Sequence, residues 1–150
     1  TSLNLSSNRL CGVYKENPWD RDLKGTYDAS GIKALASAIS VTAVLTNLSV
    51  AYNSGISGEA AQQLAAAVLD SKTLEVFSQI PINEIREDKH TELSLCHKGL
   101  GPTEGMVLAA LVQGSSVLTK LDARLNILRD EGKKVLRDAA EGREGFRLIL

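Results

Sequence analysis

The stretch TSLNLSSNRL, residues 1–10, carries leucines and an asparagine in the spacing L-x-L-x-x-N-x-L. Related spacings recur three times further along the chain. They comprise Leu45, Leu48, Val50 and Asn53, then His90, Leu93, Leu95, Lys98 and Leu100, then Leu118, Leu121, Ala123, Asn126 and Leu128. The interval from Leu93 to Leu121 equals that from Leu118 to Phe146. A fixed internal period of about 28 residues indicates an array of stacked units.

A second spacing places a leucine ten positions before the apolar residue that starts four of the later strand patterns. The pairs are Leu35 and Leu45, Leu64 and Leu74, Leu108 and Leu118, and Leu136 and Phe146. The stretches that include or surround the first member, such as GEAAQQLAAAVL and GPTEGMVLAALV, are rich in good helix formers with apolar residues at helical spacing. Each unit is therefore predicted to be a short strand, a turn and a helix.

Alternating leucines give each predicted strand an apolar flank that one unit cannot bury alone, so the units should stack. Stacking predicts a parallel sheet on the inner side of a curve and helices on the outer side. Asn8, Asn53 and Asn126 fall where the strands end. An asparagine amide both donates and accepts hydrogen bonds, so we predict that these three residues are structural and satisfy the turn backbone.

The pattern L-x-x-L-x-L-x-x-N-x-L followed by a glycine-containing helix start resembles the leucine-rich repeat. The closest form is the ribonuclease-inhibitor-like one, whose repeat is about 28 residues long. The resemblance covers nearly the whole chain. It implies an α/β leucine-rich repeat solenoid, with a short parallel β-sheet on the concave side and helices on the convex side. Residues 1–150 would form a single domain of this kind.

An insertion of about 17 residues near positions 11–30 interrupts the first unit, and such insertions form loops on one face of an array. It is visible because the interval from Leu10 to Leu35 is about three times that from Leu100 to Leu108. The insertion is polar and contains Pro18 and Trp19. Two interpretations remain open. Trp19 covers part of the array as a surface loop folds back, or it is presented to a partner as an aromatic anchor.

A shortened, irregular unit spans residues 74–90, since the interval from Phe77 to Leu93 is far shorter than that from Leu93 to Leu121. Pro81 opposes a helix there, so an extended or turn segment is expected in its place. No polar capping unit precedes Thr1 or follows Leu150. The chain is thus expected to be a segment of a longer array, or to self-associate through exposed terminal strands.

The composition narrows the class of function. Seventeen basic and 18 acidic residues give a net charge of −1, which disfavours nucleic acid and anionic membrane surfaces as partners. No stretch is apolar enough to span a membrane, and two cysteines favour a reducing, cytoplasmic location. We find no catalytic, cofactor or metal motif. Cys96 beside His97, with His90 nearby, is the nearest approach to a reactive cluster, but adjacent strand residues project to opposite sides.

The inner strand face is the favoured binding surface, because its positions carry the non-leucine residues of successive units. Its informative candidates are Tyr52, Glu92, His97, Lys120, Asp122 and Arg124, and the same rows include Ala51, Ser78 and Ile80. The resemblance implies a non-enzymatic scaffold that binds another protein through this face or through the loop at Pro18 and Trp19. Two alternatives stay open: a GTPase-activating protein of the Ran class, and a passive spacer within a longer repeat protein.

Overall fold

The computed structural model describes residues 1–14, 22, 24–53 and 55–150, so the predictions for Pro18 and Trp19 lie outside the described residues. The described residues form a mixed α/β structure of five helices and two small sheets. The helices are α1 (Ser30–Val41), α2 (Gly58–Asp70), α3 (Ile82–Arg86), α4 (Pro102–Gly114) and α5 (Arg129–Ala140). The strands are β1 (Ser2–Asn4), β2 (Asn47–Ser49), β3 (Val76–Phe77), β4 (Ile80–Pro81), β5 (Glu92–Ser94), β6 (Lys120–Asp122) and β7 (Arg147–Ile149).

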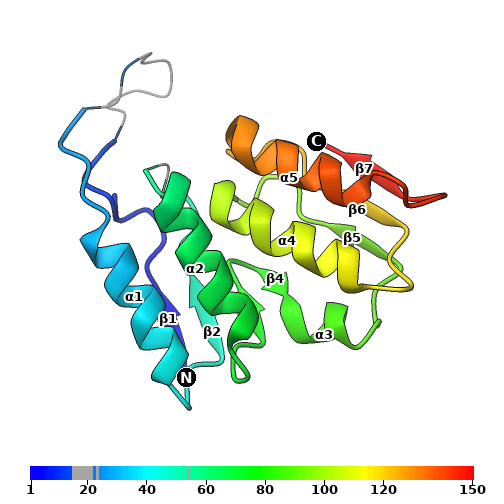
Figure 1. The fold of residues 1–150 in the computed structure, drawn as a ribbon, viewed down its shortest axis with the longest axis horizontal. Coiled ribbons are helices and arrows are strands. Elements are labelled where there is room, and N and C mark those ends of the chain that lie inside the picture. The colour runs from blue at the N-terminus through cyan, green and yellow to red at the C-terminus, as the bar shows by residue number, and fades with distance from the viewer. Residues whose placement is uncertain (15–21, 23, 54) are drawn as a thin grey trace.

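The four longer helices, α1, α2, α4 and α5, pack side by side in chain order, and the strands lie behind them in Figure 1. The central helix α4 is buried on most of its surface because α2 and α5 contact it from both sides. Its contact with α5 depends on glycine, since a Cβ on Gly105 would lie 2.9 Å from the Cα of Gly132. Helices and strands thus form two layers with the apolar core between them.

The strand register follows the repeat that the sequence predicted. In the first sheet Ser2 is paired with Asn47, and Asn47 with Val76, all in parallel strands. In the second sheet the parallel strands β5, β6 and β7 place Lys120 between Glu92 and Arg147. Leu93 and Leu121, the equivalent leucines of successive units, are paired. The polar positions of neighbouring strands therefore share rows.

The prediction of one short parallel sheet is wrong at the shortened unit. There β4 turns back antiparallel on β3, and the structure has one sheet of β1–β4 and a second of β5–β7. Ser78 and Gln79 form the reversal with φ of 46° and 69°, as a two-residue hairpin of right-handed twist requires. Because β4 turns back on β3, β5 is hydrogen-bonded only to β6 among the described strands.

The expectation of an extended or turn segment in place of a helix is also wrong, because α3 begins directly after Pro81. Proline is tolerated at a helix start, where its missing N–H has no intrahelical partner. Ile82 and Ile85 of this short helix are buried, and Ile80 before it is fully buried. The short helix thus supplies the apolar side chains that a longer one supplies elsewhere.

The core collects the repeated leucines and also part of the insertion. Leu48, Phe77 and Leu121 are fully buried. Cys11 and Val13, at the base of the insertion, are buried in the same cluster. There the main chains of Tyr14 and Lys24 exchange two hydrogen bonds of 2.9 and 2.8 Å. The base of the insertion is therefore part of the core, which its polar composition did not suggest.

Candidate functional site

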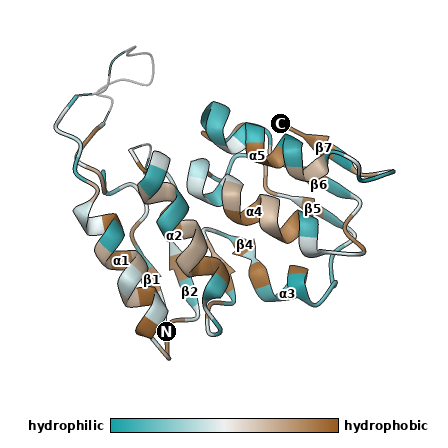
Figure 2. Ribbon diagram, viewed as in Figure 1, coloured by the Kyte–Doolittle hydropathy of each residue, from teal (hydrophilic) through white to brown (hydrophobic). Residues whose placement is uncertain are grey.

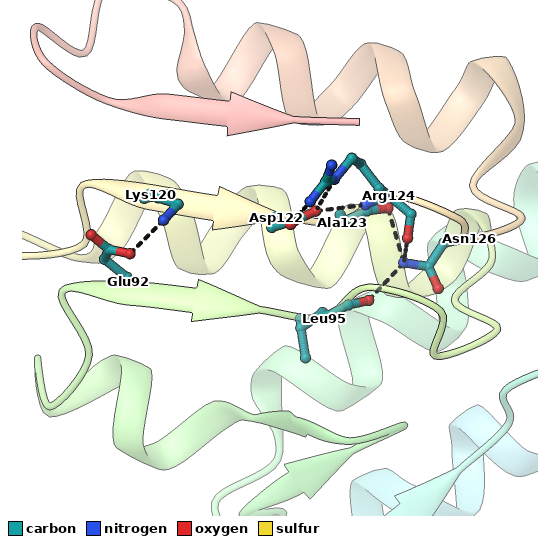
Figure 3. A network of polar contacts seen from close by, with 7 residues as sticks. All are labelled: Glu92, Leu95, Lys120, Asp122, Ala123, Arg124 and Asn126. Atoms are coloured by element: carbon teal, nitrogen blue, oxygen red, sulfur yellow. Dashed lines mark hydrogen bonds and ion pairs between the residues drawn. The ribbon is translucent and has the colours of Figure 1, made fainter.

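Four charged residues predicted as binding candidates gather on β5, β6 and the turn after β6. The parallel register sets Glu92 beside Lys120, and the Lys120 Nζ donates a hydrogen bond of 2.6 Å to Glu92 Oε2 (Figure 3). Arg147 follows in the same row on β7 and is exposed. We call Glu92, Lys120, Asp122 and Arg124 the inner-face cluster.

The ion pair between Asp122 and Arg124 fixes the orientation of an exposed guanidinium. Arg124 donates from Nε at 3.0 Å and from Nη2 at 2.7 Å to the two carboxylate oxygens of Asp122. The side chain of Asp122 is 12% exposed, whereas that of Arg124 is 56% exposed. The hydrogen bonds from Arg124 hold the pKa of Asp122 below its ordinary value. These two hydrogen bonds thus fix the orientation of the Arg124 guanidinium.

The turns after three strands present a row of projecting side chains that we call the turn ridge: Tyr52, His97 and Leu125. All three have left-handed backbone, with φ of 60°, 58° and 56°. The main-chain N–H of Tyr52 bonds to the Gly99 carbonyl at 2.9 Å, and that of His97 to the Arg124 carbonyl at 3.0 Å, so successive turns are stacked. Tyr52 is 48% exposed and Leu125 is 75% exposed.

Leu125 was not predicted from the sequence as a site residue, although its neighbours Arg124 and Asn126 were named. The signal was present in the spacing, since Ser7, Tyr52, His97 and Leu125 each precede the asparagine position of their unit. Their left-handed backbone could not be foreseen, because residues other than glycine and asparagine rarely adopt it.

Tyr52 has a second role at the gap between the two sheets. Its ring covers Gly99 so closely that a Cβ on that glycine would lie 2.5 Å from three ring carbons. Its hydroxyl donates to the main-chain oxygen of His97 at 3.4 Å. Tyr52 therefore connects the turn after β2 to the turn after β5.

Asn53 and Asn126 make the same set of hydrogen bonds in different units. Asn126 Oδ1 accepts from the main-chain N–H groups of Lys98 and Leu100 at 2.9 and 3.1 Å, and Nδ2 donates to the carbonyl oxygen of Leu95 at 2.8 Å. Figure 3 shows the donor side of this network. Asn53 likewise accepts from the main-chain N–H groups of Asn8 and Leu10.

Asn8, the third predicted structural asparagine, differs from the other two. It is exposed, and its Nδ2 donates at 3.1 Å to the carbonyl oxygen of Ser6, two positions back. In the described part of the chain its Oδ1 accepts no hydrogen bond. Asn8 lies on the outer side of β1, where no described unit precedes it.

Buried polar side chains form hydrogen bonds in the gap between the two sheets. Ser78 Oγ accepts from the Val50 N–H at 3.0 Å and donates to Glu104 Oε1 at 2.8 Å. Glu104 Oε2 accepts from the Gly101 N–H at 2.9 Å. Burial raises the pKa of Glu104.

Four residues predicted for the solvent-facing inner rows do not lie on an exposed face. Ser78, Ala51, Ile80 and Asp122 are all buried, so the expectation that they face solvent is wrong. Ser78 and Ile80 belong to the reversal between β3 and β4, which turns them away from the register of the other units.

Among the described residues, His90, Cys96 and His97 share no hydrogen bond with one another. His90 Nε2 lies 2.7 Å from Glu84 Oε2, and this pair is separate from Cys96 and His97 in the hydrogen-bond network. Cys96 is half-buried and unpaired, and Cys11 is buried. The described residues contain no group of three or more histidine, cysteine, aspartate or glutamate side chains placed to hold a metal ion.

Neither a family model nor a curated protein matches the chain. Within residues 1–14, 22, 24–53 and 55–150, no helix has the length and apolar character needed to cross a membrane.

Proposed function

We propose that the chain is a leucine-rich repeat solenoid whose exposed strand ends bind another protein without catalysis. The solenoid is supported by the parallel pairing of equivalent leucines and by the identical hydrogen bonds of Asn53 and Asn126. Each asparagine accepts hydrogen bonds from main-chain N–H groups in the turn of the preceding unit. Each unit is thus stabilised by its neighbour, as in a repeat array. The free thiols of Cys11 and Cys96 are compatible with a cytoplasmic location.

Leu125 is the observation that carries the binding proposal. A left-handed turn position favours glycine or asparagine, and a leucine there loses backbone energy on the order of 1–2 kcal/mol. Leu125 gains little in return from packing, since three quarters of it is exposed. Neither the turn nor the core therefore accounts for a large apolar side chain at this position, whereas a partner that buries it would.

The residues around Leu125 match what protein interfaces use. Arg124, next in the chain, offers a guanidinium already fixed by Asp122, so little side-chain entropy is lost on binding. Tyr52 and His97 extend the same ridge, and aromatic and arginine side chains dominate binding energy at interfaces. We assign the partner to the turn ridge together with the inner-face cluster.

The test uses a variant that should leave the fold intact. Leu125→Asn places a residue suited to left-handed backbone at the ridge, so the free energy of unfolding should be unchanged or rise. Affinity purification from source cells should recover partner proteins with the wild type and lose them at least tenfold with Leu125→Asn. Val44→Asn, which changes a residue 64% exposed and outside the ridge, is the matched control.

A recovered partner should then bind the purified wild type in calorimetry and bind Leu125→Asn more weakly by the same factor. Equal recovery by all three proteins would contradict the proposal and leave the passive-spacer alternative. Loss with Val44→Asn alone would move the site to the other end of the molecule.

A further inference from the structure

The gap between the two sheets is crossed by fewer main-chain hydrogen bonds than the boundary between two paired strands. At the boundary between β5 and β6, the His97 N–H bonds to the carbonyl of Arg124 at 3.0 Å. At the gap, the Tyr52 N–H bonds at 2.9 Å to Gly99, which lies three positions beyond Cys96, the residue equivalent to Arg124. Within the described residues, this is the only main-chain hydrogen bond between residues 1–90 and residues 91–150.

Two side-chain hydrogen bonds close the gap on the strand side. The Tyr52 hydroxyl donates to the main-chain oxygen of His97 at 3.4 Å, and the Ser78 hydroxyl donates to Glu104 Oε1 at 2.8 Å. Tyr52 and Ser78 both have left-handed backbone, with φ of 60° and 46°. Because this conformation is unfavourable for residues other than glycine, the strand side of the gap is closed at a cost in backbone energy.

The helix side of the gap is held more firmly. α2 and α4 are in contact, and Figure 2 shows hydrophobic residues on both helices. Between the starts of α2 and α5, the Gly58 N–H donates to Glu131 Oε2 at 3.2 Å. After α3, the Asp88 carboxylate accepts from the Ser115 hydroxyl at 2.7 Å and from the Ser116 N–H at 3.1 Å. The two parts of the molecule are thus joined along the helices and behind α3.

Glu104 places a titratable group inside this gap. It is 3% exposed, and its carboxyl contacts the Ser78 hydroxyl and the Gly101 N–H, neither of which carries a charge. No charged residue on α2, α3 or α5, the helices that contact α4, is buried. Those on α2 and α3 are Glu59, Asp70, Glu84 and Arg86, and the least exposed on α5 are Glu131 and Lys133. An ionised Glu104 in the closed gap therefore has no cation beside it, and burial raises its pKa.

We propose that loss of the Glu104 proton opens the gap between the sheets at the turn ridge, while α2 and α4 stay packed. In the open form the carboxylate reaches water, and Tyr52 releases Gly99. Opening also separates Tyr52 from His97 and Leu125, which divides the surface assigned to a partner. Only this last consequence rests on the proposed function, since opening itself requires no partner.

The effect of pH on opening follows from proton linkage. The open form should have the ordinary carboxyl pKa of 4.5, whereas the closed form binds the proton more tightly. Opening therefore releases a proton and is favoured as pH rises. Between the two pKa values, each pH unit should make opening about tenfold more favourable.

Amide hydrogen exchange of the free chain, measured by NMR, tests this proposal. The measured quantity is the protection factor, which removes the direct effect of pH on the exchange rate. The protection factor of the Tyr52 N–H should fall about tenfold per pH unit above about pH 4.5, and then level off at the closed-state pKa. The His97 N–H is the matched control, because its hydrogen bond to Arg124 does not cross the gap.

Glu104→Gln supplies the second comparison. The glutamine side chain keeps an acceptor for the Gly101 N–H and a donor for Ser78 Oγ, but it cannot ionise. Protection of the Tyr52 N–H in this variant should not vary between about pH 4 and pH 8. If the variant fails to fold by circular dichroism, the comparison of Tyr52 with His97 in the wild type decides.

Three results would overturn the proposal. The first is a Tyr52 protection factor that stays constant with pH in the wild type. The second is an equal decrease at Tyr52 and His97, which indicates unfolding of the whole chain rather than opening of the gap. The third is a folded Glu104→Gln that shows the same decrease as the wild type. None of them bears on partner binding by the turn ridge, because no partner is present in the measurement.

Discussion

We call the contact between two neighbouring units of this molecule a joint. Two of these joints supply hydrogen bonds to buried main-chain groups, but with different side chains. Between β5 and β6, paired strands and the neutral amide of Asn126 satisfy the turn. Between β2 and β5, where the shortened unit intervenes, the Val50 N–H bonds to the hydroxyl of Ser78, which in turn bonds to the buried carboxyl of Glu104. The regular joint is neutral, whereas the interrupted joint depends on a titratable group.

The largest effect is expected from removing a core leucine of the regular joint. Leu121 is fully buried, so Leu121→Ala should lower the free energy of unfolding by about 2–5 kcal/mol in chemical denaturation. Leu125→Ala, nearby in the chain and exposed, is the matched control and should change it by less than about 0.5 kcal/mol. Similar losses in the two variants would mean that the strand register is wrong.

A smaller loss should follow removal of the asparagine of the regular joint. Asn126→Ala leaves the N–H groups of Lys98 and Leu100 without their acceptor, at a cost of about 1–3 kcal/mol. Asn53→Ala should cost a similar amount, because its hydrogen bonds are the same. Asn8→Ala should cost less than about 0.5 kcal/mol in the monomer, since Asn8 is exposed. Equal losses at all three sites would show that the asparagine hydrogen bonds between units do not stabilise the joint.

The smallest effect on the free energy of unfolding is expected at Glu104 of the interrupted joint. This effect depends on pH and grows as pH rises. Burial raises the folded-state pKa of Glu104 above the ordinary value of 4.5, so the folded state binds the proton more tightly than the unfolded state. Its contribution to stability is therefore complete below about pH 4.5 and is lost as pH rises through the folded pKa. Glu104→Gln cannot ionise at this position, so its free energy of unfolding should not show this decrease with pH.

The measurement is urea denaturation of both proteins between about pH 4 and pH 8, a range that spans the expected titration. The free energy of unfolding of the wild type should fall relative to Glu104→Gln as pH increases. Asn126→Ala serves as the comparison at the regular joint, because its difference from wild type should not vary with pH. A difference for Glu104→Gln that is flat with pH would show that the carboxyl keeps its ordinary pKa.

Much of the fold followed from local pattern, as particular residues show. The spacing of Leu93 and Leu121 predicted their pairing, and Glu92 and Lys120 lie in one row as the repeat predicted. The predictions failed at Ser78, Ala51 and Ile80, which are buried rather than facing solvent. Those residues lie at or beside the shortened unit, where a fixed register no longer applies because the chain reverses after β3.

The sequence by itself determined the strand, turn and helix of each regular unit, since these depend on the spacing of apolar residues and on helix propensity within a few residues. Only the tertiary structure decided that the sheet divides in two, that Glu104 is buried against Ser78, and that Leu125 projects into solvent. Such features arise from contacts between residues far apart in the chain. Their energies depend on how whole units stack, which no local spacing records.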